Sequence, residues 1–415
     1  MRLNIYKKNF AITFLCIYML TKMLWDTLVP NIFELISLAI IAYGIFMYFK
    51  ETKFTKNSFS IVALIVLFSI YILFNSFTKD NTQQMSRALY EYIFYLFIIF
   101  AVNYYLQKTD IHRMIKILNG LGIVIVVLSW YEYLTKSYLI GSFSNTILYS
   151  NNSAFRAAVF SRSYLCHGII IGFFSLLSFF LLLDTKKKKY LFQTVITYGT
   201  ILTTSSRGPL VATGVALLFM YLANEYGQNN SIDKKVLTWC SLAVLALIIF
   251  SFLTSTFTTG NETIDYFLYR TRKIIDWSGD AGNVGRIRLW NNAIEWFKTD
   301  ILFGIGASKT GSWGTGSLGV TESGVLKRLC ELGIVGFLLF YTLIFRIVKV
   351  GIRNYKLSNY CMKLIYILFF GIFIMIMIND ITVQSTEEIM VSFLLMLSLG
   401  GMNIRMNDKV FRKDY

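Results

Sequence analysis

Residues 190–223, YLFQTVITYGTILTTSSRGPLVATGVALLFMYLA, place a short polar turn between two apolar runs. The turn, TTSSRGPL (203–210), holds a lone arginine, Arg207, and one of only two prolines in the chain. Each run has roughly the length that a helix needs to cross a bilayer core about 30 Å thick. The stretch therefore predicts a helical hairpin inside a membrane.

The composition of the whole chain extends this prediction. Of the 415 residues, 55% are hydrophobic and 15% are charged, and the mean hydropathy is +0.57. One soluble core could not bury so many apolar residues and still present a polar surface to water. We therefore predict an all-α polytopic integral membrane domain over residues 1–415, with about twelve transmembrane helices. The expected spans are 9–25, 32–49, 58–77, 88–106, 115–134, 165–183, 190–205, 209–223, 236–254, 330–349, 360–379 and 387–402.

The distribution of positive charge predicts the orientation of these spans. More than half of the 40 Lys and Arg residues lie in every second connection, beginning with the N-terminal segment MRLNIYKKNF. The alternating connections DTLVPN (26–31) and NDITVQST (379–386) carry no Lys or Arg. Because short cytoplasmic loops are rich in Lys and Arg, we predict that both termini are cytoplasmic. Topology and anionic lipid then explain the net charge of +17, and no nucleic-acid partner is needed.

Two expected outer loops are long, and loops of that length are usually functional. They cover residues 135–164 and residues 255–329, the second being a large loop between the ninth and tenth spans. Within it, GRIRLWNNAIEWF (285–297) has the apolar spacing of an amphipathic helix, through Ile287, Trp290, Ile294 and Phe297. The glycine-rich stretch 304–319 follows no strand and lacks the GK[ST] of a phosphate loop, so we interpret it as a flexible connector.

Counted from a cytoplasmic N-terminus, Arg207 lies in an outer turn and breaks the charge pattern. Pro209 suits the first turn of a helix, and Ser205 or Ser206 can cap that turn. Backbone N–H groups beside a guanidinium form a phosphate site, although a lipid headgroup is the simpler partner for one isolated arginine. Further outer arginines favour phosphate, because arginine recognises it in a bidentate manner. They are Arg156, Arg162, Arg270, Arg272, Arg286 and Arg288.

Three segments carry a resemblance to a known family. SSRGPLVATGVALLF (205–219), GRIRLWNNAIEWFKTDILFGIGAS (285–308) and ESGVLKRLCELGIVGFLLFYTLIF (322–345) resemble the O-antigen ligase and Wzy-type polysaccharide polymerase superfamily. The resemblance runs from about Arg156 to Phe345 and implies a GT-C-like helical fold. It also implies an enzyme that transfers a glycan from a polyprenyl-pyrophosphate (undecaprenyl-pyrophosphate) carrier at the outer face of the cytoplasmic membrane of a bacterium.

The resemblance assigns candidate site residues by position. Arg207 matches the arginine of the family's SRG turn, and Arg286 matches the arginine four residues before a tryptophan. In the segment FRAAVFSRSYLCHGIIIG (155–172), Arg156 is the preferred counterpart of a family arginine and Arg162 is the alternative. Many ligases have a His-Asn pair where this chain has Glu322-Ser323, a departure that favours a polymerase. The candidate substrate-binding residues are Arg156, Arg162, Ser206 and Arg288.

The expected chemistry stabilises the negative charge that builds on a pyrophosphate leaving group. The chain has no Asp-x-Asp motif and only two histidines, so we predict a metal-independent glycosyltransferase without a cofactor, in which the arginines hold the pyrophosphate. Glu322 is the first candidate for the base that activates the acceptor hydroxyl, and a helix-start acid is its structural alternative. The reserve candidates are Asp380, Glu387 and Glu388. We interpret other charges at span ends as structural pairs: Lys22, Asp26, Glu34, Arg87 and Glu91.

The predicted function is a polysaccharide polymerase for capsule or exopolysaccharide in the cell envelope. Donor and acceptor are lipid-linked oligosaccharides, and further candidate partners are membrane lipids, a flippase and a chain-length regulator. The alternative within the family is a ligase that attaches finished glycan to another acceptor. A transporter of lipid-linked sugars is the alternative from another class, and it would place charges at midspan.

Overall fold

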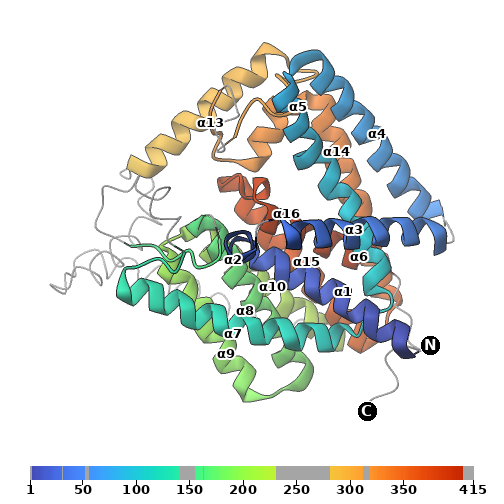
Figure 1. Cartoon of the computed structure of the whole chain (residues 1–415), viewed down its shortest axis with the longest axis vertical. Coiled ribbons are helices and arrows are strands. Elements are labelled where there is room, and N and C mark those ends of the chain that lie inside the picture. Colours follow the sequence, from blue (N-terminus) through green and yellow to red (C-terminus); the bar gives the residue numbers. More distant parts are fainter. Residues whose placement is uncertain are drawn as a thin grey trace.

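The computed structural model describes residues 2–29, 31–51, 56–140, 155–161, 163–229, 281–311 and 318–404. Every regular element in these segments is a helix (Figure 1). The first half of the chain forms α1 (Arg2–Leu20), α2 (Lys22–Leu28), α3 (Ile32–Glu51), α4 (Lys56–Lys79), α5 (Thr82–Ala88), a π-helix (Leu89–Phe94), α6 (Tyr95–Leu106), α7 (Ile111–Thr135), α8 (Tyr164–Thr185) and α9 (Lys188–Thr200). The second half forms α10 (Arg207–Asn229), α13 (Ala281–Thr299), α14 (Gly324–Leu357), α15 (Tyr360–Thr382) and α16 (Ile389–Asn403). The predicted fold class, an all-helical polytopic membrane protein, is confirmed.

The predicted count of twelve spans is not confirmed. In the described part of the chain, eight helices are long and apolar enough to cross a membrane, and a ninth span results if the bent pair α1 and α2 is counted as one. The expected span 9–25 is broken at Thr21, where the two helix axes differ by 83°. The expected spans 190–205 and 387–402 correspond to the shorter helices α9 and α16. The expected span 236–254 lies outside the described residues.

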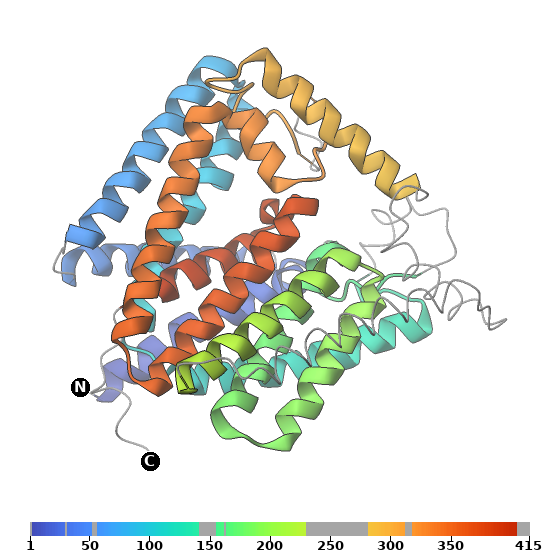
Figure 2. The ribbon, with the colours of Figure 1, turned by 180° about the vertical axis from the view of Figure 1, so that it is seen from behind.

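Helix α8 is the most enclosed of the candidate spans, with 83% of its apolar window buried. It packs against α7, α9, α10 and α15, and α10 runs along α15 (Figure 2). Two glycines permit this packing. A Cβ on Gly168 would lie 2.9 Å from the ring of Pro209, and one on Gly172 would lie 2.3 Å from the hydroxyl of Thr213. Small residues at such contacts let membrane helices approach closely.

Helix α14 is bent at Gly333, whose φ of 61° and ψ of −174° lie outside the helical region. The segment 301–306 pairs with the backbone at this break. Ile334 N–H donates to the carbonyl of Ile301 at 2.9 Å, and Ile305 N–H donates to the carbonyl of Cys330 at 2.9 Å. The first half of the glycine-rich stretch is thus held by α14, and its interpretation as a flexible connector is wrong up to Gly311. Residues 312–317 lie outside the described part.

The predicted amphipathic helix is present as α13, which packs on α14 (Figure 1). Its buried side is centred on Ala293, which is 1% exposed, and Trp290 lies partly buried beside it. Ile287 and Ile294, which the sequence placed on the same apolar face, remain 40% and 39% exposed. The predicted stripe is therefore divided between a face that contacts α14 and an exposed apolar edge.

Candidate active site

A pocket of about 310 Å³ lies where one end of the helix bundle meets α13. Helices α8, α10 and α14 begin beside it and α15 ends beside it, so segments far apart in sequence form one wall. The described residues that line the pocket are Arg156, Tyr164, Leu165, Ser205, Ser206, Arg207, Gly208, Gly285, Arg286, Leu289, Glu322, Thr382 and Val383.

The turn TTSSRGPL forms the floor of this pocket through Ser205, Ser206, Arg207 and Gly208. A 3-10 helix (Ile201–Thr204) ends at Ser205 in the left-handed conformation, with φ of 51°, and α10 begins at Arg207. Pro209 lies in the first turn of α10, as predicted. The hydroxyl of Ser206 donates to the carbonyl of Thr204 at 3.2 Å, and this residue is only 7% exposed. Arg207 therefore lines the pocket as the first residue of α10, where the first N–H groups point along the helix axis.

Gly208 brings α15 close to this helix start. A Cβ at position 208 would lie 2.8 Å from the side-chain oxygen of Asn379, closer than real Cβ contacts allow. The glycine in SRG thus leaves room for the side chain of Asn379 on the neighbouring helix, which would have to shift to admit a larger residue.

Arg286 and Glu322 face each other across the pocket. Their Nε and Oε2 atoms are 3.6 Å apart, and their side chains are 29% and 30% exposed. Trp290, one turn after Arg286 on α13, donates its indole N–H to the carbonyl of Glu322 at 3.2 Å. Helix α13 therefore contacts both the side chain and the backbone of Glu322.

The backbone of Glu322 is in the left-handed conformation, with φ of 52°. Residues on both sides hold it there. Thr321 donates its N–H and its hydroxyl to the amide oxygen of Gln384, at 3.2 Å and 2.8 Å. Ser323 is the N-cap of α14 and accepts from the N–H of Leu326 at 3.3 Å. Glu322 thus lies one residue before the N-cap of α14, beside the N-terminus of that helix.

Arg156 reaches the pocket from the segment before α8. Its guanidinium carbon lies 4.3 Å from the centre of the Tyr164 ring, a cation–π contact. Its Nε atom is buried and has no hydrogen-bond partner among the described residues. A buried donor without a partner is costly, and an anion in the pocket would supply the missing acceptor.

The remaining predicted residues are placed differently. Arg288 is exposed on α13 and is not among the residues that line the pocket. Arg162, Arg270 and Arg272 lie outside the described residues. The structure thus brings together Arg156, Ser206, Arg207, Arg286 and Glu322, and their roles in a reaction stay predictions. The described lining holds three arginines, the start of α10 and one carboxylate, so it suits an anion with more than one negative charge.

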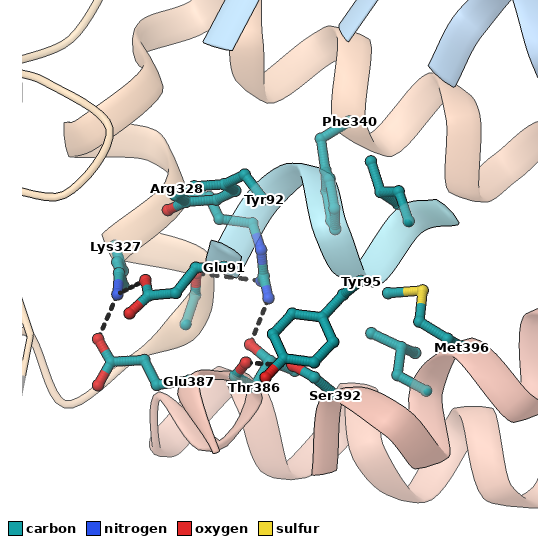
Figure 3. A pocket seen from close by; sticks show the side chains of 13 residues that line it. Glu91, Tyr92, Tyr95, Lys327, Arg328, Phe340, Thr386, Glu387, Ser392 and Met396 are labelled. Atoms are coloured by element: carbon teal, nitrogen blue, oxygen red, sulfur yellow. Dashed lines mark hydrogen bonds and ion pairs between the residues drawn. The ribbon is translucent and has the colours of Figure 1, made fainter. Parts of the chain in front are cut away.

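A second group of charged residues lines a separate pocket (Figure 3), and its two cations, Lys327 and Arg328, were not among the candidates named from sequence. Lys327 of α14 bonds with Glu387 and, at 2.9 Å, with Glu91. Arg328 bonds with Asp380 at 2.6 Å and with the Gly324 carbonyl at 3.1 Å. These pairs tie the start of α14 to the segment after α15. Two of the reserve bases, Asp380 and Glu387, are therefore engaged in buried ion pairs.

The charges interpreted as structural do form pairs. Lys22 lies 3.1 Å from Asp26 and 3.6 Å from Glu34, and Arg87 bonds with Glu91. The acid of α14, Glu331, accepts from Tyr92 at 2.5 Å and from the hydroxyl of Thr310 at 2.7 Å. The signal for this network was present in sequence, since Lys327, Arg328 and Glu331 fall within two turns of an apolar helix, where ionisable residues need partners.

Comparison with protein families identifies the region that holds this pocket. Residues 192–341 match the family model described as O-antigen ligase, and the resemblance seen in the sequence is confirmed over this region. The match includes Arg207, Arg286 and Glu322, whereas Arg156 precedes it. The domain supports an enzyme of glycan assembly in this family. No match is found among curated proteins.

Proposed function

We propose that this protein is a polysaccharide polymerase that joins polyprenyl-pyrophosphate-linked repeat units at the outer face of the cytoplasmic membrane. The observation that carries the proposal is the pocket lined by Arg156, Arg207, Arg286 and the start of α10, with Glu322 as the one carboxylate among its described lining residues. A pyrophosphate has the charge and the several acceptor oxygens that such a set of donors recognises.

In the proposed reaction the acceptor hydroxyl attacks the anomeric carbon of the donor glycan. The bond from that carbon to the pyrophosphate oxygen breaks, and the electron pair leaves with the lipid pyrophosphate. The arginines and the α10 N–H groups stabilise the charge that develops there. Glu322 accepts the proton of the attacking hydroxyl. The residues that perform these steps need no metal ion.

The arrangement of Arg286 and Glu322 supports a base at this position. The 3.6 Å pair keeps the carboxylate beside the arginine that would bind the donor. The left-handed backbone of Glu322 adds to this support, because strained residues persist where surrounding structure fixes them and cluster at active sites.

A ligase is the second candidate, because the matching family model is described as O-antigen ligase. Donor and leaving group are the same in both reactions, and only the acceptor differs. Glu322-Ser323, in place of the His-Asn pair of many ligases, is the reason we place the polymerase first.

The test is to delete the gene in its host and restore it as wild type, Arg207→Ala, Arg207→Lys or Lys298→Ala. Single repeat units at the surface of the deletion strain, without long chains, would support a polymerase, whereas long chains retained on the carrier lipid would identify a ligase. We expect Arg207→Ala to lower polymer formation by about 10²- to 10³-fold, the usual cost of one lost donor to a developing anion. Arg207→Lys keeps the charge but loses the bidentate fork, so most activity should be lost there too.

Lys298→Ala is the matched control. It removes a positive charge from α13 at a side chain that is 60% exposed and lies outside the pocket lining. Normal polymer lengths with a stably expressed Arg207→Ala protein would refute the pyrophosphate site.

A further inference from the structure

The carboxylate of Glu132, near the end of α7, is completely buried and binds three backbone N–H groups. Its Oε1 atom accepts from Leu139 at 2.9 Å. Its Oε2 atom accepts from Ala158 at 3.0 Å and from Val159 at 2.9 Å. The residue is 0% exposed. Neither oxygen lies within ion-pair distance of a Lys or Arg among the described residues, so hydrogen bonds from the backbone are what compensate its burial.

These bonds connect two segments that are adjacent in space and separated in sequence. Leu139 belongs to the segment that leaves α7, and Ala158 and Val159 belong to the segment that enters α8. The ring centres of Tyr138 and Phe155 are 4.5 Å apart, which places the same two segments in contact. The second segment is also tied to the turn of the pocket floor, since Ala157 N–H donates to the carbonyl of Thr203 at 3.0 Å.

The backbone at Val159 shows that this arrangement is imposed. Its φ of 42° is a conformation that β-branched residues strongly disfavour. The N–H of Val159 is one of the three that Glu132 binds, so the carboxylate holds the chain in a shape that the local sequence would not choose.

Arg156 lies two residues before Ala158, whose N–H group Glu132 binds. Its guanidinium lies on Tyr164 and lines the pocket. A carboxylate has two acceptor atoms with free lone pairs, enough for three donors, whereas a glutamine offers one acceptor and adds two N–H groups. By its charge alone, the Glu132 carboxylate would weaken the binding of an anion in the pocket, so a contribution to anion binding has to come from its hydrogen bonds.

We propose that Glu132 is a positioning residue for the pyrophosphate of the donor, acting through the segment 156–159 to hold Arg156 in the pocket. The inference rests on the proposed function. Glu132 lies outside residues 192–341, which match the family model, so the family motifs do not assign it a role in donor binding.

The experiment compares purified full-length wild type, Glu132→Gln, Arg156→Ala and the double variant in lipid nanodiscs. Thr135→Ala, a change one turn along α7 at an exposed residue, is the matched control. We expect Glu132→Gln to lower kcat/KM for the lipid-linked donor on the order of 10- to 100-fold, the effect of a displacement of about 1 Å, mainly through a higher KM. In the double variant, Glu132→Gln should lower kcat/KM little beyond the effect of Arg156→Ala alone, because both changes remove the same interaction with the donor. Multiplied losses would overturn the inference, since a general structural role adds to any other defect.

Binding of inorganic pyrophosphate, followed as the rise in apparent melting temperature, tests the inference without catalysis. If Glu132 acted only through its charge, Glu132→Gln would bind pyrophosphate more tightly, because a nearby negative charge has been removed. If it positions Arg156, the same variant binds more weakly, so the two explanations predict opposite signs. Tighter or unchanged binding overturns the inference.

Two further comparisons keep the outcomes separate. If Glu132→Gln does not yield folded protein, Glu132→Asp keeps the charge and withdraws the carboxylate by one methylene, and it should weaken pyrophosphate binding in the same direction. Wild-type donor kinetics in Arg156→Ala would count against the proposed pyrophosphate site. An impaired Arg156→Ala beside a fully active Glu132→Gln would refute only the role of Glu132.

Discussion

Replacing Glu322 by glycine separates a catalytic carboxylate from a structural one. The left-handed backbone at φ 52° costs a non-glycine residue roughly 1 to 2 kcal/mol. Glycine removes that cost. However, glycine also has more conformational freedom in the unfolded chain, which lowers the free energy of unfolding by roughly 0.4 to 1 kcal/mol. The Arg286 pair, at 3.6 Å between partly exposed side chains, contributes about 0 to 1 kcal/mol. These three terms nearly cancel. We therefore expect the free energy of unfolding of the Glu322→Gly variant to lie within about 1 kcal/mol of the wild-type value.

Glu322→Gln is the matched variant, because it also loses the ion pair but keeps the strained backbone. The glycine variant should be at least as stable as the glutamine variant, by up to about 1.5 kcal/mol. Both should lose polymerisation by roughly 10²- to 10⁴-fold, the usual contribution of a positioned base. Apparent melting temperature in detergent and polymer length from purified lipid-linked repeat units measure the two quantities. A glycine variant clearly less stable than the glutamine variant, or near-normal polymerisation by either, would refute the reasoning.

Two further predictions concern the backbone and the pH dependence of stability. Gly333→Ala should destabilise the protein by more than about 2 kcal/mol, because the new Cβ would lie 2.4 Å from the carbonyl oxygen of Leu302 at a φ of 61°. Gly319→Ala, where φ is 93° and nothing lies within 4 Å, is the control, and equal losses of melting temperature in the two variants would contradict a steric cause. Burial raises the pKa of Asp80, although Lys79 and Lys309 partly oppose the shift. Ionised Asp80 therefore destabilises the fold as the pH rises above the pKa of about 3.9 that this group has in the unfolded chain. Asp80→Asn should therefore melt at a higher temperature than wild type at neutral pH and lose this advantage below about pH 4; a constant difference across pH would exclude the titration of Asp80 as its cause.

The elements that sequence predicted well are those whose apolar runs are long and uninterrupted, such as α3, α8 and α15. The bend of α14 could not be predicted, because Gly333 leaves the helical region to pair with residues 301–306, which are distant in sequence. The break after Leu20 has the same character, since nothing in FAITFLCIYMLTKMLWDTL interrupts the apolar pattern strongly.

The site shows a similar division. Arg207, Arg286 and Glu322 could be proposed from short motifs, and the structure places all three beside one pocket. Gln384 and Glu132 could not be proposed, because they act on the backbone of Thr321 and Val159 through contacts that only the tertiary fold creates. Polar residues that bind backbone carry no motif of their own.

The buried pairs of Lys327 and Arg328 constrain the order in which the protein is built. A buried charge without its partner is strongly destabilising. Arg328 leaves the ribosome 52 residues before its partner Asp380, and Lys327 leaves it 60 residues before Glu387. The first half of α14 can therefore reach its final place only after α15 has been synthesised. Because Glu322 directly precedes the N-cap of α14, the pocket is among the last parts of the newborn chain to be completed.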